Sequence, residues 1–273
     1  MCFSIGHTSL RRLLPFCPGS PVGNYISVCA GGESFLHCGL CLDRREGSDL
    51  ISTEPGAARR STVADLPSII PLFPLPNLVL FPGVSVPLHI FEPRYREMVA
   101  EVASDHRTIG MILLKGDWER EYYAQPDVFS VGCAGRIGGL LKLPDGRYNM
   151  VLEGFSEFRV IREVRGRSYR QAEVQWIPTP PSALRLDQEM MDGLREMLVS
   201  YVGEVAAQAW QSLVVERGLS GAQLVNFICF QLDITPLEKQ TLLEAGADRL
   251  NCLFDILTFR LEERKAGGSG GIQ

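Results

Sequence analysis

The spacing of apolar residues changes near residue 177, and this change divides the chain into two patterns. Before it, short apolar runs alternate with polar residues between prolines and glycines, as in short β-strands. The clearest is a hairpin: residues 131–143 lead into the turn Pro144-Asp145-Gly146, and residues 147–153 return. Short, edge-like strands are predicted at residues 69–75, 78–81 and 84–90, a compact apolar strand at residues 109–114, and half-buried strands at residues 158–162 and 169–176. One helix is predicted among them, starting near Glu92 with Pro93 in its first turn.

After a stiff connector that contains three prolines, apolar residues recur with helical spacing. Residues 186–215 form one long helical region, which we expect to break near Gly203. Capping boxes at Ser220 and Thr235 indicate two further helix starts. The last helix has one apolar stripe, made of Leu250, Leu253, Phe254, Leu257 and Leu261. The sequence therefore predicts a helical bundle over residues 182–264 and a disordered, glycine-rich tail over residues 265–273.

The first 65 residues follow neither pattern. They contain Cys2, Cys17, Cys29, Cys38 and Cys41, which are most of the eight cysteines of the chain. A secretory signal would need a longer apolar core than this segment offers. Cys29, His37, Cys38 and Cys41 could form a metal knuckle, although the usual two Cys-x-x-Cys pairs are not present. We favour a third interpretation, in which residues 1–65 are a disordered or mis-assigned leader; whether they are translated, or translation starts near Val63, stays open.

Composition and charge narrow the class of protein. Of 273 residues, 45% are hydrophobic and 22% are charged, as in an ordinary globular protein. No apolar run approaches the roughly 18 to 20 residues that a membrane span requires. The net charge of −5 argues against a dedicated nucleic-acid binder, which usually presents a basic face. We therefore expect a cytoplasmic protein with neither a membrane nor a nucleic acid as its partner.

The sequence contains no motif of the common enzyme classes. A phosphate-binding G-x-x-x-x-G-K-[ST] loop, a zinc-binding H-E-x-x-H and a G-x-S-x-G nucleophile elbow are all missing. His89 alternates with apolar neighbours, which favours a core or rim position over a catalytic base. Cys133, Cys229 and Cys252 lie at apolar positions and are expected to be buried. We therefore predict no catalytic residue and no cofactor, and we assign no metal ligand.

A basic cluster lies on the predicted hairpin between residues 158 and 176. Its members are Arg159, Arg162, Arg165, Arg167 and Arg170. Such a cluster could bind RNA or an acidic partner. However, Glu157, Glu163 and Glu173 are interleaved with the arginines and reduce the positive potential. We favour a solvated hairpin over a binding patch.

Three segments resemble the amino-terminal, substrate-binding domain of Lon proteases. The first is Ile-Pro-Leu-Phe-Pro-Leu-Pro-Asn-Leu-Val-Leu-Phe-Pro-Gly at residues 70–83, followed by Pro87-Leu88 and Phe91-Glu92-Pro93-Arg94-Tyr95. The second comprises residues 131–137, 143–147 and 151–154, and the third comprises residues 237–244 and 248–250. They occur in the order of that family and extend the resemblance over about residues 66–263.

The resemblance implies an α+β fold in which a PUA-like β pseudo-barrel over residues 66–177 is followed by an α-helical bundle subdomain over residues 182–264. It implies binding of polypeptides without hydrolysis, because the ATPase and Ser–Lys protease modules of full Lon proteases do not occur in this sequence. We therefore expect a free-standing, non-catalytic domain that binds unfolded or exposed polypeptide segments. An adaptor role in protein quality control, with a protease or a chaperone as partner, stays open. RNA binding is the alternative function, since PUA-like folds can bind RNA.

Aromatic residues at loop-like positions are the candidate polypeptide-binding residues. Phe91 and Tyr95 lie at the predicted helix start, and Trp118, Tyr122 and Tyr123 lie in a polar loop. Contiguous exposed apolar surface is typical of interaction sites. A structural role, in which these rings seal the ends of the barrel, stays open for each of them.

Overall fold

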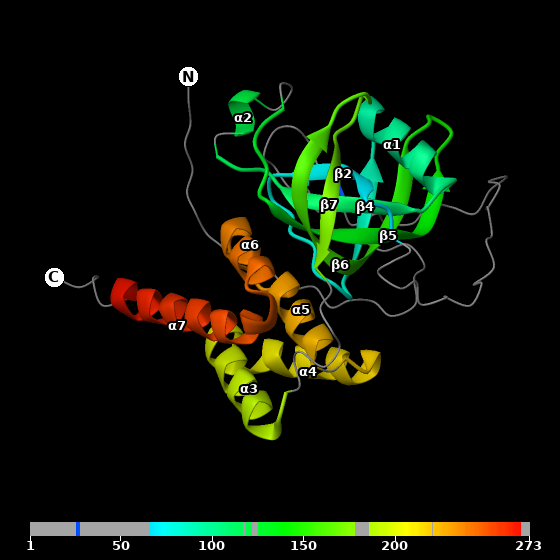
Figure 1. Cartoon of the computed structure of the whole chain (residues 1–273). Coiled ribbons are helices and arrows are strands. Elements are labelled where there is room, and N and C mark those ends of the chain that lie inside the picture. Colours follow the sequence, from blue (N-terminus) through cyan, green and yellow to red (C-terminus); the bar gives the residue numbers. More distant parts are fainter. Residues whose placement is uncertain are drawn as a thin grey trace, which may run out of the picture.

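The computed structural model describes residues 26–27, 66–116, 118–121, 125–177, 186–219 and 221–268. Figure 1 shows the strands in one half of the molecule, with α1 beside them, and helices α3 to α7 in the other half. The strands are β1 (Ile26–Ser27), β2 (Ile69–Leu75), β3 (Ser85–Ile90), β4 (Thr108–Leu113), β5 (Val131–Lys142), β6 (Tyr148–Val164) and β7 (Gln171–Ile177). The helices are α1 (Pro93–Ala103), α2 (Trp118–Glu121), α3 (Gln188–Val202), α4 (Glu204–Arg217), α5 (Ala222–Gln231), α6 (Pro236–Glu244) and α7 (Arg249–Gly268), with a 3-10 turn, η2 (Gly246–Asp248), before α7.

The strands form one mixed sheet in the order β1-β3-β6-β5-β4-β2-β7, and β7 also pairs with β6. The pairing therefore returns to β6, as a pseudo-barrel requires. However, β2 pairs antiparallel with β7 over Ile69–Pro71 and parallel with β4 over Leu72–Leu75. Because β2 divides its length between two neighbours, the pseudo-barrel is not clearly closed. The predicted α+β class is confirmed.

Three strand predictions need correction. Strand β2 is not an edge strand, because it pairs on both sides. Residues 78–81 are buried but form no strand. Strand β6 does not end at Gly154: the Gly154 N–H donates to the Val84 carbonyl, and the Gly83 N–H donates to the Gly154 carbonyl, each over 2.8 Å. A Cβ at position 154 would overlap the Phe81 carbonyl, so glycine is needed where the two segments meet.

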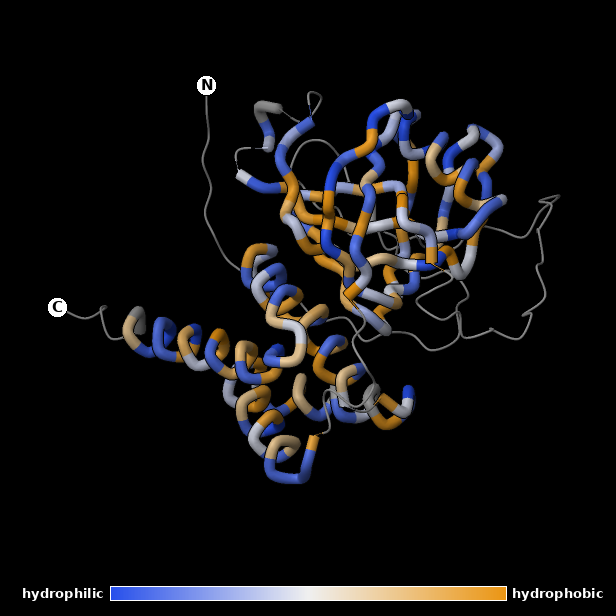
Figure 2. Tube along the Cα trace, in the orientation of Figure 1, coloured by the Kyte–Doolittle hydropathy of each residue, from blue (hydrophilic) through white to orange (hydrophobic). Residues whose placement is uncertain are grey.

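The helix boundaries largely follow the local sequence. The predicted break falls at Gly203, which has φ +87° and separates α3 from α4. The capping box at Thr235 is confirmed, because Thr235 and Glu238 each accept the other's backbone N–H at the start of α6. Ser220, the first residue of the other predicted box, lies outside the described residues, and α5 begins at Ala222, after Gly221. Along α7, hydrophobic and hydrophilic residues alternate (Figure 2), and Leu250, Leu253 and Leu257 are buried, in agreement with the predicted stripe.

The two halves share one hydrophobic core. The main buried cluster joins sheet residues such as Val86 and Leu152 to helix residues such as Leu224 and Leu253. A second, smaller cluster surrounds Phe158 on the sheet. Buried apolar contact across the junction therefore contributes to holding the halves together.

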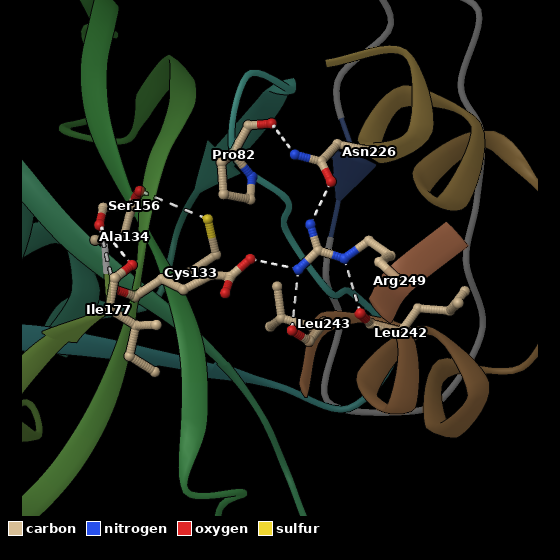
Figure 3. A network of polar contacts seen from close by, with 10 residues as sticks. Pro82, Cys133, Ala134, Ser156, Ile177, Asn226, Leu242, Leu243 and Arg249 are labelled. Carbon is tan, nitrogen blue, oxygen red and sulfur yellow. Dashed lines mark hydrogen bonds and ion pairs between the residues drawn. The ribbon is translucent and has the colours of Figure 1, made fainter. Parts of the chain in front are cut away.

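A buried polar network also crosses this junction (Figure 3). Arg249, at the start of α7, has no exposed surface and donates to the carbonyl oxygens of Leu242 at 2.8 Å and Leu243 at 3.0 Å. Its guanidinium also donates to Asn226 on α5 and forms an ion pair with Glu157 on β6. Asn226 in turn donates to the Pro82 carbonyl over 2.8 Å. One arginine thus connects two helices, a strand and the residue 78–84 segment.

The leader predicted for residues 1–65, with its metal knuckle, lies outside the described residues except for Ile26–Ser27, which pair with Leu88 and His89 of β3. The division into a subdomain that ends at residue 177 and one that begins at residue 182 stays a prediction. The elements change from strand to helix between Ile177 and Gln188. The predicted tail falls partly within α7, which extends to Gly268. No helix in the described part of the chain is long and apolar enough to cross a membrane.

Candidate polypeptide-binding surface

The start of α1 places the first two candidate residues in different environments. Phe91 follows β3 and is partly exposed, with its ring 6.2 Å from the His89 ring and nearly parallel to it. Tyr95 is buried, and its ring centroid lies 4.4 Å from that of Phe73. Phe91 can therefore contact a partner, whereas Tyr95 is mainly a core residue.

Of the three aromatic residues predicted to lie in the polar loop, the structure describes one, Trp118. Trp118 begins the short helix α2 and is partly exposed. Tyr122 and Tyr123 lie outside the described residues. Figure 1 shows α2 at the margin of the sheet half. A partly exposed indole at this place is compatible with the predicted binding role, which stays a prediction.

A cavity of about 130 Å³ separates the start of α1 from the β6–β7 turn. Its lining includes Tyr95, Pro126 and Arg167. Next to Arg167, the Tyr169 hydroxyl donates to Glu101 on α1 over 2.6 Å. Burial, with this hydrogen bond to Glu101, raises the pKa of Tyr169 to about 12. The cavity thus joins the predicted aromatic helix start to the predicted arginine hairpin.

The arginines of that hairpin are largely neutralised by glutamates. Arg162 pairs with Glu173 at 2.6 Å, and Arg167 pairs with Glu101 at 3.0 Å. Arg170 pairs with Glu163 and also donates to the Pro126 carbonyl over 2.6 Å. These pairs support the interpretation of a solvated hairpin. Glu157 is the exception, because it is buried beside Arg249 instead of facing the cluster.

A second recess, which the sequence analysis missed, lies in the helical half. A groove of about 280 Å³ runs between α3, α4 and α5, with Leu194, Leu198 and Leu224 in its lining. Asp192 and Arg195 also line it. The apolar positions of α3 were visible in the sequence. The groove itself depends on how α3, α4 and α5 pack, which the sequence alone does not show.

The histidines and thiols of the described residues do not form a reactive group. The His89 ring contacts Asn149 at 2.6 Å through Nδ1, in line with a rim position. Burial raises the pKa of Cys133 well above its usual value and that of Cys229 to about 12, so neither thiol is a ready nucleophile. Within residues 66–116, 118–121, 125–177, 186–219 and 221–268, no group of three or more potential ligands could hold a metal ion.

Comparison with known proteins identifies the family. The family model described as the ATP-dependent protease La (LON) substrate-binding domain matches residues 69–258, which include every strand and helix from β2 to most of α7. This chain belongs to the Lon substrate-binding domain family. The resemblance seen in the sequence is therefore confirmed.

Curated relatives are full Lon proteases from bacteria. Lon protease 2 of Myxococcus xanthus is 27% identical over 184 residues, which are 66% of this chain and 22% of the relative. Lon protease of Flavobacterium johnsoniae is 24% identical over 218 residues, which are 77% of this chain and 26% of the relative. The chain thus spans about a quarter of the length of these relatives.

Two solved structures show the same fold. The Lon N-terminal domain protein from Xanthomonas campestris is 25% identical, with a TM-score of 0.50, over 70% of this chain and 97% of that chain. The N-terminal domain of Lon protease from the Mycobacterium avium complex is 16% identical, with a TM-score of 0.53, over 70% of this chain and 98% of that chain. Together they show that about 70% of this chain has the fold of a Lon N-terminal domain.

Proposed function

We propose that this protein binds exposed segments of unfolded polypeptides and has no catalytic activity of its own. The observation that carries the proposal is the family match over residues 69–258, which accounts for nearly all described elements as a substrate-binding domain. Phe91 and Trp118 provide partly exposed aromatic rings for such contacts, and Tyr122 and Tyr123 stay in the proposal by their position in the chain. An adaptor role, in which a protease or a chaperone receives the bound client, is part of the same proposal.

RNA binding is the weaker alternative. Three arginines of the hairpin, Arg162, Arg167 and Arg170, already pair with glutamates. The chain also has a net charge of −5. A protein that follows nucleic-acid phosphates releases counterions on binding, so its affinity falls steeply with salt. Polypeptide binding through apolar contacts should depend much less on salt.

The test is the affinity for an unfolded model protein, measured by fluorescence anisotropy at low and high salt. A central aromatic anchor contributes about 2 kcal/mol, so replacing Trp118 with Ala should weaken binding about thirtyfold. The matched control is the double replacement of Arg165 and Arg167 with Ala, which should change the affinity little. Wild-type affinity should stay nearly constant as salt rises.

Two outcomes would contradict the proposal. One is a reversed ranking, in which the arginine variant abolishes binding and Trp118→Ala has no effect. The other is loss of binding on nuclease treatment of a lysate pull-down, which would favour RNA. If thermal unfolding shows that Trp118→Ala is not folded, Phe91→Ala takes its place, because Phe91 is partly exposed at the end of a strand.

The absence of catalysis is tested separately. The purified full chain should neither hydrolyse ATP nor cleave casein, because the sequence offers no phosphate-binding loop and no activated nucleophile. ATP turnover is measured by phosphate release and proteolysis by gel. Turnover that persists at constant specific activity through repeated purification would overturn the non-catalytic assignment.

A further inference from the structure

A shallow hollow of about 380 Å³ lies between α1 and the β5–β6 hairpin. Its lining consists of Pro93, Arg96, Glu97, Lys142, Gly146 and Tyr148. The hollow therefore combines two cations, one carboxylate and the apolar surfaces of a proline and a tyrosine.

The charges around the hollow are unevenly paired. Asp145 is engaged by Arg147, whose guanidinium lies 2.5 Å from its carboxylate, and this bond lowers the pKa of Asp145. Glu97 accepts a hydrogen bond from Ser168 Oγ over 2.7 Å. In contrast, neither Arg96 nor Lys142 has a carboxylate within 4.0 Å among the residues that the structure describes. Two cations thus line the hollow without a carboxylate in direct contact, and Asp145, whose pKa the charge of Arg96 also lowers, is bonded to Arg147.

The hairpin turn fixes the position of Arg96. The Gly146 N–H donates to the Leu143 carbonyl over 2.9 Å, and the Leu143 N–H donates to the Arg147 carbonyl over 2.8 Å. Gly146 has φ +81°, and a Cβ there would overlap the Arg96 guanidinium. The guanidinium therefore lies directly against the turn and is half-buried. Partly buried charges are usually paired, and Asp145, the carboxylate on which Arg96 acts, already accepts hydrogen bonds from Arg147, so the Arg96 guanidinium is available to a further anion.

We propose that Arg96 and Lys142 bind a side-chain carboxylate of an acidic segment in the polypeptide client. This inference rests on the proposed function and adds a preference for clients with an Asp or Glu. A guanidinium binds a carboxylate in a planar, bidentate way, and a lysine ammonium adds a second charge. Pro93, which is exposed, offers apolar contact to the neighbouring client residue, and the buried ring of Tyr148 lies 5.8 Å from the Lys142 ammonium.

A carboxylate fits better than a phosphate backbone. Glu97 is exposed within the lining, and Asp145 is exposed in the β5–β6 turn that borders it. A single carboxylate brings one negative charge to the hollow, whereas a chain of phosphates would bring several close to these two acidic groups and be repelled more strongly. The local charge thus favours one anionic side chain over a polyanion.

The experiment uses the full-length protein and two fluorescent peptides that differ at one residue only, Glu in one and Gln in the other. Each peptide also contains apolar residues for the aromatic surface. Wild-type protein should bind the acidic peptide about tenfold more tightly than the amide peptide, as charge-assisted hydrogen bonds predict. The double variant Arg96→Ala, Lys142→Ala should bind both peptides equally and retain the affinity of wild type for the amide peptide.

The matched control is Arg159→Ala, Arg165→Ala, which removes two exposed charges elsewhere and should keep the tenfold preference. Equal binding of both peptides by wild type would overturn the carboxylate site while leaving the proposed function intact. Failure of wild type to bind either peptide would overturn both. A single-stranded RNA is also added as competitor for the acidic peptide. If the RNA binds wild type more tightly than the peptide does, and the Arg96→Ala, Lys142→Ala variant no longer binds it, the two cations bind phosphate and the inference is overturned.

Discussion

Two regions of this protein hold arginines next to glutamates, and their surroundings differ sharply. On the hairpin, Arg162 and Glu173 form an ion pair whose side chains are 67% and 33% exposed. At the junction of the two halves, Arg249 and Glu157 form a pair whose side chains are 0% and 2% exposed. The same two residue types thus occur once in water and once in the core. The role of an ion pair in this protein therefore depends on its solvent access rather than on its composition.

The buried Arg249–Glu157 pair is also stabilised by hydrogen bonds to neighbouring groups. Arg249 donates to two carbonyl oxygens, to Asn226 and to Glu157, and its guanidinium lies 5.3 Å from the centre of the Phe81 ring. Removing two charges from water costs several kcal/mol, which only good geometry and further hydrogen bonds can offset. The pair therefore holds a specific arrangement of the halves, and loss of one partner leaves the other charge buried alone.

The largest effect is expected from Arg249→Met. The variant leaves the Glu157 carboxylate buried without a cation, which typically costs about 3–5 kcal/mol. Urea unfolding followed by tryptophan fluorescence and by circular dichroism measures the free energy of unfolding. The double variant Arg249→Met, Glu157→Leu should recover part of the loss, because it removes both charges. A loss below about 1 kcal/mol for Arg249→Met would show that water enters the junction freely.

An intermediate effect is expected at Glu238, whose side chain is 21% exposed. Arg260 donates to it over 2.8 and 2.6 Å. This pairing, with Thr235, lowers the pKa of Glu238 from 4.5 to about 2. Because the folded pKa is depressed, the stabilisation is fully present above pH 4.5 and is lost as the pH falls toward 2.

The variant Glu238→Gln isolates this charge, since glutamine can still complete the capping box at Thr235. At pH 7 it should reduce the free energy of unfolding by about 1 kcal/mol or less, because the pair is partly screened by water. Urea unfolding at several pH values should show the difference from wild type shrinking below pH 4.5. A difference that stays constant down to pH 2 would refute the assigned charge effect.

The smallest effect is expected from Arg162→Ala on the hairpin. Exposed ion pairs contribute little, so the free energy of unfolding should change by less than about 0.5 kcal/mol. The same urea experiment measures it beside Arg249→Met. A loss as large as that of the buried variant would remove the contrast between the two regions.

The features that could be predicted from the sequence are those that depend on residues adjacent in the chain. The capping box at Thr235, the break at Gly203 and the turn at Gly146 each follow from a few adjacent residues, and the structure has them. The failures have a long-range cause. The sequence pattern places Glu157 on the surface hairpin, but its partner Arg249 lies 92 residues away along the chain. The pattern also ends a strand before Gly154, whereas in the structure β6 continues through this glycine, which contacts residues 81–84.

For the candidate surface, part of the missing information was present in the sequence. Tyr95, Met98, Val99 and Val102 are all buried on α1 and recur with helical spacing. This stripe would have placed Tyr95 in the core. The hollow at Arg96 and Lys142 could not be predicted, because it depends on α1 and the β5–β6 turn meeting in space.

The distance along the chain between Glu157 and Arg249 also sets an order of events during synthesis. A ribosome adds about 5–20 residues per second, so the 92 residues between them take roughly 5–18 s to make. When Glu157 has been made, strands β2 to β5 already exist as polypeptide, while the glutamate has no arginine with which to enter the core. We therefore expect the nascent sheet half to remain hydrated at this edge. The core around Glu157 can close on its ion pair only after the first turn of the last helix has left the ribosome.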